Sequence, residues 1–194
     1  MQGFVCQGLL KYMKNTGLIL LLLSVCFSKL SAQYLSGFSS QFDNDLAQWV
    51  IYPEDEQMPQ CELRCRWQFK QDPTEWDFRM GDISGTIRSK WKDRLDEWEV
   101  ISENQIARLR MVWPRDPREW RIESGDSEYV IRMKYNHPGS DWEVENEGKI
   151  IFSCSTAYQN DIRDWIIRDD LPEELHFNGR IAMVFAVILS NLMN

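Results

Sequence analysis

Residues 89–98 read Ser-Lys-Trp-Lys-Asp-Arg-Leu-Asp-Glu-Trp, and this stretch contains one copy of the repeat that decides the fold. An acidic residue followed by tryptophan recurs along the chain at a nearly constant spacing of 22 residues, with a last step of 23. The pairs are Glu75-Trp76, Glu97-Trp98, Glu119-Trp120, Asp141-Trp142 and Asp164-Trp165. A fixed period of this length is typical of a repeated supersecondary unit.

Each repeat has the pattern of a β-hairpin. A second aromatic residue precedes each tryptophan, by nine residues in the first repeat and by seven in the others. These leading aromatics are Trp67, Trp91, Trp113, Tyr135 and Tyr158. Turn-forming residues lie between the two aromatics, and an alternating run, a short polar break and a second alternating run indicate a hairpin. We therefore expect five consecutive hairpins over roughly residues 61–169, connected as an antiparallel meander.

The predicted register places each leading aromatic opposite its tryptophan. With that register Lys90 lies opposite Glu99, whereas Met111 lies opposite Ile122 on the other face. The sequence thus predicts one apolar face that carries both series of aromatic residues and one solvated face striped with opposite charges. Each exposed cross-strand pair contributes roughly 0.2 to 1 kcal/mol, so these charges set register and solubility more than stability.

An apolar segment at the C-terminus can cover the tryptophan-rich face. Residues 180–189 are an almost unbroken apolar run after the turn formers Asn178-Gly179. Its alanine, methionine and leucine content favours a buried helix, and a closing barrel strand is the alternative. The predicted fold class is mainly β. We expect an antiparallel meander of about five tandem 22-residue β-hairpin repeats that forms a curled sheet or barrel, covered by a helix at residues 180–190.

The first 32 residues have the features of a secretory signal peptide. An apolar run at residues 17–27 follows two lysines, and the small residues Ser31-Ala32 precede Gln33. The run is too short to span a bilayer comfortably. We expect residues 1–32 to be a signal peptide and residues 33–194 to be a single β-rich domain, located in the periplasm, in the outer envelope or outside the cell.

Other readings of the N-terminus stay open. Translation from Met13 gives a shorter signal, lipidation at Cys26 gives a lipoprotein, and a retained N-terminus gives a membrane anchor. Removal of residues 1–32 takes away three lysines and no acidic residue, so the formal net charge changes from -8 to -11. Such an acidic chain is a poor partner for nucleic acid or anionic lipid. The expected partner is a protein or a small ligand, not nucleic acid, and a membrane tether is not favoured.

Three cysteines remain in the expected mature chain. Cys61 and Cys65 are roughly 13 Å apart along one strand at about 3.3 Å per residue, which is too far for a direct bridge. A disulfide, if one forms, therefore joins Cys154 to Cys61 or to Cys65.

The sequence offers no catalytic, cofactor-binding or metal-binding motif. The acidic residues before the tryptophans follow the repeat, as structural pairs do. We therefore expect an exported, non-enzymatic protein that serves as a structural or protein-interaction module. The alternative is a β-domain that binds a small ligand, carbohydrate or lipid, through its tryptophan-rich face. Its candidate contacts are Trp49 and Trp165, at the ends of the sheet where cover is thinnest.

Overall fold

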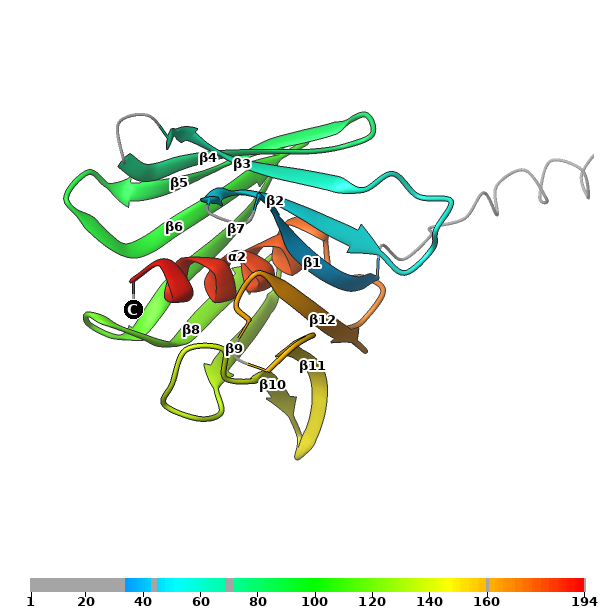
Figure 1. Cartoon of the computed structure of the whole chain (residues 1–194), viewed down its shortest axis with the longest axis vertical. Helices are drawn as coiled ribbons and strands as arrows, with labels where there is room; N and C mark the ends of the chain where they lie inside the picture. The colour runs from blue at the N-terminus through cyan, green and yellow to red at the C-terminus, as the bar shows by residue number, and fades with distance from the viewer. Residues whose placement is uncertain (1–33, 43–44, 69–71, 160, 194) are drawn as a thin grey trace, which may run out of the picture. The chain divides into compact units, whose positions relative to one another are not determined.

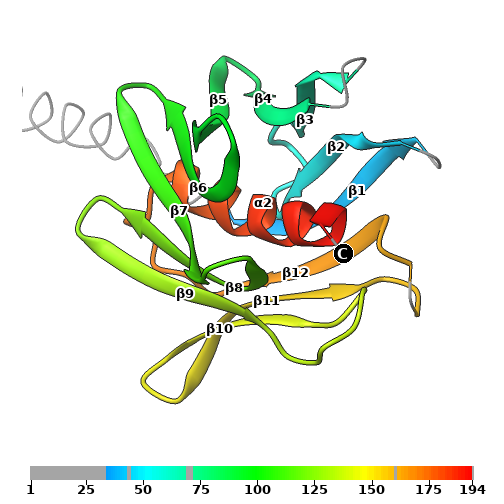
Figure 2. The same ribbon diagram turned by 90° about the vertical axis from the view of Figure 1, so that its left-hand side faces the viewer.

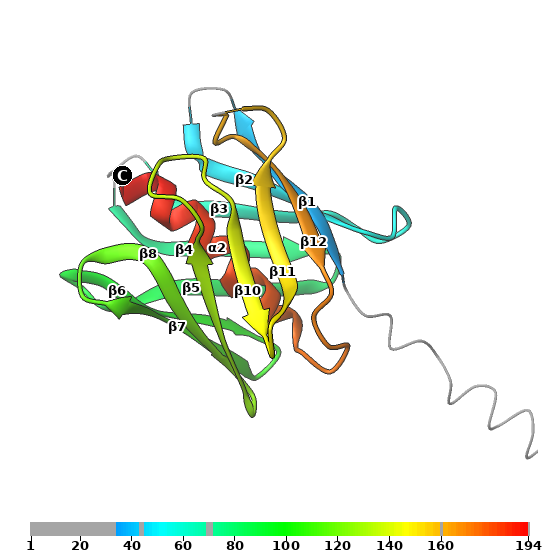
Figure 3. The same cartoon turned by 90° about the horizontal axis from the view of Figure 1, so that it is seen from below.

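The computed structural model describes residues 34–42, 45–68, 72–159 and 161–193. In this part of the chain, twelve antiparallel strands form a meander that closes into a barrel, because β1 pairs with both β2 and β12 (Figures 1 and 3). The expected mainly β meander of hairpins is confirmed, and of the two predicted forms the structure has the barrel. The predicted signal peptide and Cys26 lie outside the described residues.

Strands of five to nine residues build the barrel. The first six are β1 (Leu35–Phe42), β2 (Asp45–Pro53), β3 (Cys61–Trp67), β4 (Asp72–Met80), β5 (Ile83–Trp91) and β6 (Arg94–Ser102). The second six are β7 (Gln105–Trp113), β8 (Asp116–Ser124), β9 (Ser127–Met133), β10 (Trp142–Asn146), β11 (Lys149–Thr156) and β12 (Asp164–Asp169). A helix, α2 (Phe177–Met193), follows the last strand.

One tryptophan from each even-numbered strand points into the barrel and is fully or almost fully buried. These core tryptophans are Trp49, Trp76, Trp98, Trp120, Trp142 and Trp165. Five of the six donate their indole N–H to the carbonyl three residues earlier, as Trp98 does to Leu95 at 2.9 Å. These five buried indoles therefore keep a hydrogen bond while their rings fill the core, which avoids the cost of burying an unpaired N–H group. The indole N–H of Trp142 is buried without a hydrogen-bond partner among the described residues.

Helix α2 fills the interior of the barrel, and it confirms the helical reading of residues 180–190 (Figure 2). Residues 178–190 are all buried, as expected for a helix that is apolar on every side. The Phe185 ring packs edge-on against Trp76 and Trp98, with ring centroids 5.5 and 5.0 Å apart. Gly179 lies where the helix passes the β8–β9 turn, and a Cβ there would be 3.1 Å from Ser124 Cβ.

The observed register differs from the predicted one by two residues. Glu99 lies opposite Arg88 rather than Lys90, and Ile122 lies opposite Leu109 rather than Met111. Because side chains alternate with a period of two, this offset leaves the residues of each regular ladder, up to its bulge, on their predicted faces. The offset arises from β-bulges just before the leading aromatics, between Cys65 and Trp67 and at the equivalent positions of neighbouring hairpins.

The two ends of the barrel differ in what they carry. The hairpins β1–β2, β3–β4, β5–β6, β7–β8, β9–β10 and β11–β12 all close at one end, because strand direction alternates around the meander. The C-terminal end of α2 lies at that same end (Figure 1). The remaining connections and the start of β1 lie at the opposite end.

Candidate binding surface at the aromatic rim

Six aromatic side chains, one from each hairpin, are exposed at the end of the barrel where α2 terminates. They are Phe42, Trp67, Trp91, Trp113, Tyr135 and Tyr158, with exposed fractions between 38% and 68%. Leu192 and Met193, at the end of α2, are each 39% exposed. We call these eight residues the aromatic rim. Among the described residues, the other exposed large apolar side chains are only Ile106, Ile150 and Ile166, so exposed apolar surface is concentrated here.

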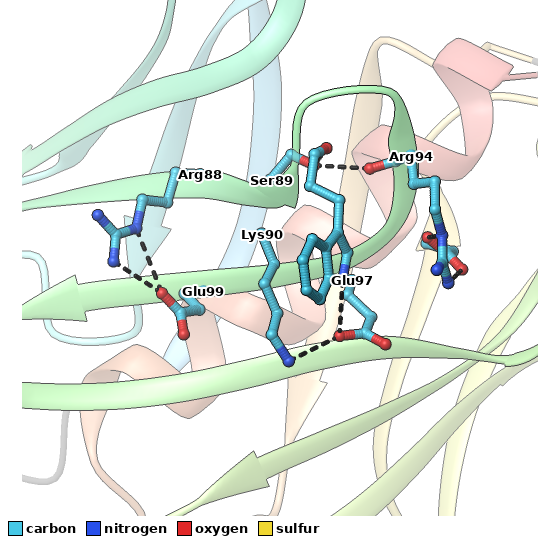
Figure 4. Close-up of polar contacts among 8 residues, drawn as sticks. Arg88, Ser89, Lys90, Arg94, Glu97 and Glu99 are labelled. Carbon is cyan, nitrogen blue, oxygen red and sulfur yellow. Dashed lines mark hydrogen bonds and ion pairs between the residues drawn. The ribbon is translucent and has the colours of Figure 1, made fainter.

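The leading aromatics were expected on the buried face, and that expectation is wrong. Bulges interrupt the ladder between the leading aromatic and the residue two positions earlier in the first four hairpins. A bulge bends the strand and redirects a side chain. In the β5–β6 hairpin, the Ser89 hydroxyl donates to the carbonyls of Trp91 and Arg94 at 2.7 Å, which supports this local geometry (Figure 4).

Glutamate side chains hold the three exposed tryptophans. The indole N–H of Trp67 donates to Glu75, that of Trp91 to Glu97 and that of Trp113 to Glu119, at 3.0, 3.4 and 3.0 Å respectively. Each glutamate is the acidic residue that precedes a core tryptophan. In these three hairpins the acidic-Trp pair therefore buries one indole and fixes another at the surface, which accounts for the glutamate at these positions.

Basic residues complete this arrangement. Lys90 donates to Glu97 at 2.9 Å (Figure 4). Arg66 donates to Glu75 at the same distance, 2.9 Å. Hydrogen bonding from Lys90 holds the pKa of the Glu97 carboxyl below its ordinary value. Glu97 is therefore ionised at neutral pH and accepts from both the lysine and the indole. The three exposed tryptophans are thus held in place by charge-assisted contacts.

The connections at the opposite end of the barrel are strongly acidic. The segments 54–60, 81–82, 103–104, 125–126, 147–148 and 170–176 contain ten acidic residues and no lysine or arginine. We call these segments the acidic rim. The described connections at the aromatic end instead contain four basic and three acidic residues, so their charge is nearly balanced. The negative charge of the barrel's connections is therefore unevenly distributed along the barrel axis.

Two shallow hollows lie beside the end of α2. One is lined by Leu95, Met111 and Met193, together with tip residues of the β5–β6 and β7–β8 hairpins. The other is lined by Leu46 and Leu192, among others. Both are continuous with the aromatic rim, so apolar surface extends from the hairpin tips to the centre of that end.

The two sequence-predicted contact residues are not exposed. Trp49 is 1% exposed and Trp165 is 3% exposed, and both pack on Phe38 with ring centroids 5.6 Å apart. The expectation of thin cover there is wrong because β1 lies between β2 and β12, so the sheet has no free edge. The exposed candidates are the leading aromatics instead, which the sequence had placed in the core.

The disulfide that the sequence left open, between Cys154 and Cys61 or Cys65, is not formed among the described residues. Cys61 and Cys65 on β3 and Cys154 on β11 are all buried free thiols. Burial raises the pKa of the Cys61 thiol to about 12 and raises that of Cys154 well above its ordinary value. Because the thiolate is the reactive form, these thiols are protected both by exclusion of reagent and by protonation.

We expect these three thiols to be unreactive in the native protein. An aromatic disulfide reagent at pH 8 should titrate none of them in the mature chain on the minute timescale, and all three after unfolding in guanidinium. Rapid release of one equivalent from the native protein would contradict the buried arrangement. An intact mass two hydrogens lighter than the reduced chain would indicate a disulfide.

The described residues contain no group of three or more histidine, cysteine, aspartate or glutamate side chains that could hold a metal ion. Within the same residues, α2 does not meet the length and hydropathy expected of a membrane-spanning helix. No family model matches the chain, and comparisons with curated proteins and with solved structures find no match. The geometry is therefore that of a closed barrel filled by its own helix, with one aromatic and one acidic end.

Proposed function

We propose that this chain is an exported, non-enzymatic β-barrel protein that serves as an interaction module and docks a partner through its aromatic rim. The observation that carries the proposal is the concentration of exposed aromatic side chains at one end of the barrel. Tryptophan and tyrosine are enriched where proteins bind other surfaces, and contiguous apolar patches on a soluble domain mark such sites.

The interior of the barrel supports this choice over ligand binding. The sequence offers the tryptophan-rich face as an alternative ligand site. In the structure this face packs against α2, whose residues 181–189 are at most 1% exposed. A ligand that stacked on the core tryptophans would have to displace the helix. The alternative of an interior carbohydrate or lipid site therefore has no supporting observation, and the outer rim takes its place.

Site-specific photo-crosslinking in cells that export the protein tests this proposal. A photoreactive phenylalanine analogue at position 91 or 113 should give a partner adduct, whereas the same group at Ile106 or Ile166 should not. The two control positions are also exposed apolar residues, but they lie at the acidic rim and on the barrel wall. The recovered protein should begin at Gln33.

Equal adduct yields at rim and control positions would contradict docking through the aromatic rim. Recovery of the chain only in the cytoplasm, with residues 1–32 intact, would contradict export. The mass of the adduct also distinguishes a protein partner from a lipid partner.

A further inference from the structure

We propose that the partner surface is a lipid bilayer, and that the aromatic rim docks the barrel on the membrane interface. This inference rests on the proposed docking function and names its partner. The rim side chains would lie among the lipid headgroups with their rings at the edge of the acyl region, while the rest of the barrel stays in water.

The chemistry of the rim fits the bilayer interface. Three of the six hairpin-tip aromatics are tryptophan and two are tyrosine, the residues that concentrate at the level of lipid headgroups. The indole N–H groups of Trp67, Trp91 and Trp113 are already bonded to glutamates. Ring insertion would therefore leave no unpaired indole donor on these residues.

The arrangement of the rim fits an extended surface rather than a groove. Each of the six hairpins that close at this end contributes one aromatic residue, so the side chains are distributed around the closed barrel. Leu192 and Met193 add apolar surface from the end of the central helix. A bilayer is a partner that can contact all these positions at once without a complementary shape.

Basic side chains accompany the rim aromatics. Lys90 Nζ lies 5.5 Å from the centroid of the Trp91 ring, and Lys134 Nζ lies 5.8 Å from that of Tyr135. Lys92 and Arg115 lie at the tips of the β5–β6 and β7–β8 hairpins. Lys90 and Lys134 are bonded to Glu97 and Glu143, so their stems cover apolar surface beside the rings. Lys92 and Arg115 are the long basic side chains at the tips that would extend to headgroup phosphates.

The charge asymmetry removes the objection that the chain is too acidic for a membrane. The unbalanced acidic residues belong to the acidic rim, at the far end of strands that reach nine residues. Such strands separate the two rims by more than about 20 Å even when tilted in a barrel. That distance exceeds two Debye lengths of about 8 Å at physiological salt. Repulsion of the acidic rim would then favour the orientation with the aromatic rim on the membrane.

A second copy of the chain is less well supported as the occupant. The connections at the aromatic end are nearly balanced in charge, so they offer little attraction for the acidic rim of another molecule. Two aromatic rims facing each other would need complementary shapes at all six hairpin tips, which a bilayer does not require. The observations therefore favour the bilayer, and self-association becomes an outcome of the test.

Vesicle flotation tests the proposal. The exported protein is mixed with vesicles of phosphatidylcholine alone or phosphatidylcholine with phosphatidylglycerol, and protein that floats with the lipid is measured. We expect binding to both, and a decrease of about tenfold or more in the partition coefficient for Trp91→Ser/Trp113→Ser, because interfacial binding scales with buried apolar area. The matched control, Ile106→Ser/Ile150→Ser, removes two exposed apolar residues from the acidic end and should change binding by less than about twofold.

Thermal unfolding of both variants first establishes that they fold. Failure of the wild-type protein to float with either vesicle overturns the proposal, as does equal loss of binding in the control variant. Concentration-dependent self-association that the rim variant abolishes, without vesicle binding, assigns the surface to a second copy instead. If position 113 crosslinks to a protein while vesicles are not bound, the membrane proposal fails and the proposed docking function stands.

Discussion

Replacing Arg180 with methionine should destabilise the barrel by about 3 to 5 kcal/mol, because it leaves a buried carboxylate without its cation. Arg180 and Asp169 form an ion pair at 2.9 Å with both side chains 1% exposed. Asp169 also accepts hydrogen bonds from the amides of Leu35 and Leu171, each at 3.2 Å. The pair therefore joins the start of α2 to the seam where the last strand meets the first.

The remaining guanidinium donors of Arg180 hold the connection before the helix. They donate to the carbonyls of Leu171, Pro172 and Leu175 at 3.2, 3.0 and 2.6 Å. Methionine has a similar stem but no donor, so it removes these bonds with little change in volume. Urea unfolding at pH 7 measures the loss.

The pH dependence of this loss identifies its cause. Burial already raises the pKa of Asp169, although Arg180 and the two amides oppose that shift. Without Arg180 the pKa of Asp169 in the folded protein rises further. When the folded pKa of a carboxyl exceeds its unfolded value, the fold loses stability as pH rises through the folded pKa. The penalty of Arg180→Met should therefore be smaller at pH 4 than at pH 7. Asp169→Asn in the same chain should recover at least about 1 kcal/mol, since the two residues are coupled. If the loss of stability in Arg180→Met is the same at both pH values and is not reduced by Asp169→Asn, the unpaired Asp169 carboxylate is not its cause.

The repeat predicted five hairpins correctly but concealed a sixth. Phe42 precedes Trp49 by seven residues, the spacing found in four of the five other repeats, with Asp43-Asn44 between them. The residue before Trp49 is Gln48, so a search for an acidic-Trp pair passed over it. Spacing between aromatics was the more general signal, because packing in the core requires the tryptophan at that position and not its neighbour.

The burial of Trp49 and Trp165 could not be predicted from local pattern. Whether a meander stays open or closes depends on pairing between its first and last strands, which are distant in sequence. Alternation of side chains describes each hairpin equally well in either case. Closure of the barrel therefore buries Trp49 and Trp165, which an open sheet would leave near its edges.

The exposure of the leading aromatics was also hidden from the sequence. A register offset of two residues keeps the two faces, so charge pairing agreed with the wrong register. The bulge that produces the offset has no side-chain signature in these repeats: the residue before the bulge is Cys65, Ser89 or Met111. The meander topology alone predicts that the hairpin tips lie at one end of the sheet. It therefore indicates that the aromatics near those tips can share one surface.

Deletion of residues 180–194 should abolish the folded barrel, because α2 supplies the centre of its core. Burial of each large apolar side chain contributes about 1.5 to 3 kcal/mol, and domains of this kind are stable by only about 5 to 15 kcal/mol in total. The nine consecutive residues 181–189 are at most 1% exposed. The burial free energy lost with them exceeds the total stability expected of the domain. It would also expose Trp76 and Trp98, which pack on Phe185.

A matched deletion of residues 192–194 removes the exposed Leu192 and Met193 from the same terminus and should leave cooperative unfolding intact. Near-ultraviolet circular dichroism of the tryptophans should collapse for the long deletion and persist for the short one. Addition of a peptide comprising residues 180–193 should restore the signal, since the strands can refold around the core contacts that the deletion removed. A long deletion that retains a sharp unfolding transition would show that the strands close without the helix. Because closure brings all six hairpin tips into one ring, the same helix that stabilises the core also determines whether the aromatic rim exists.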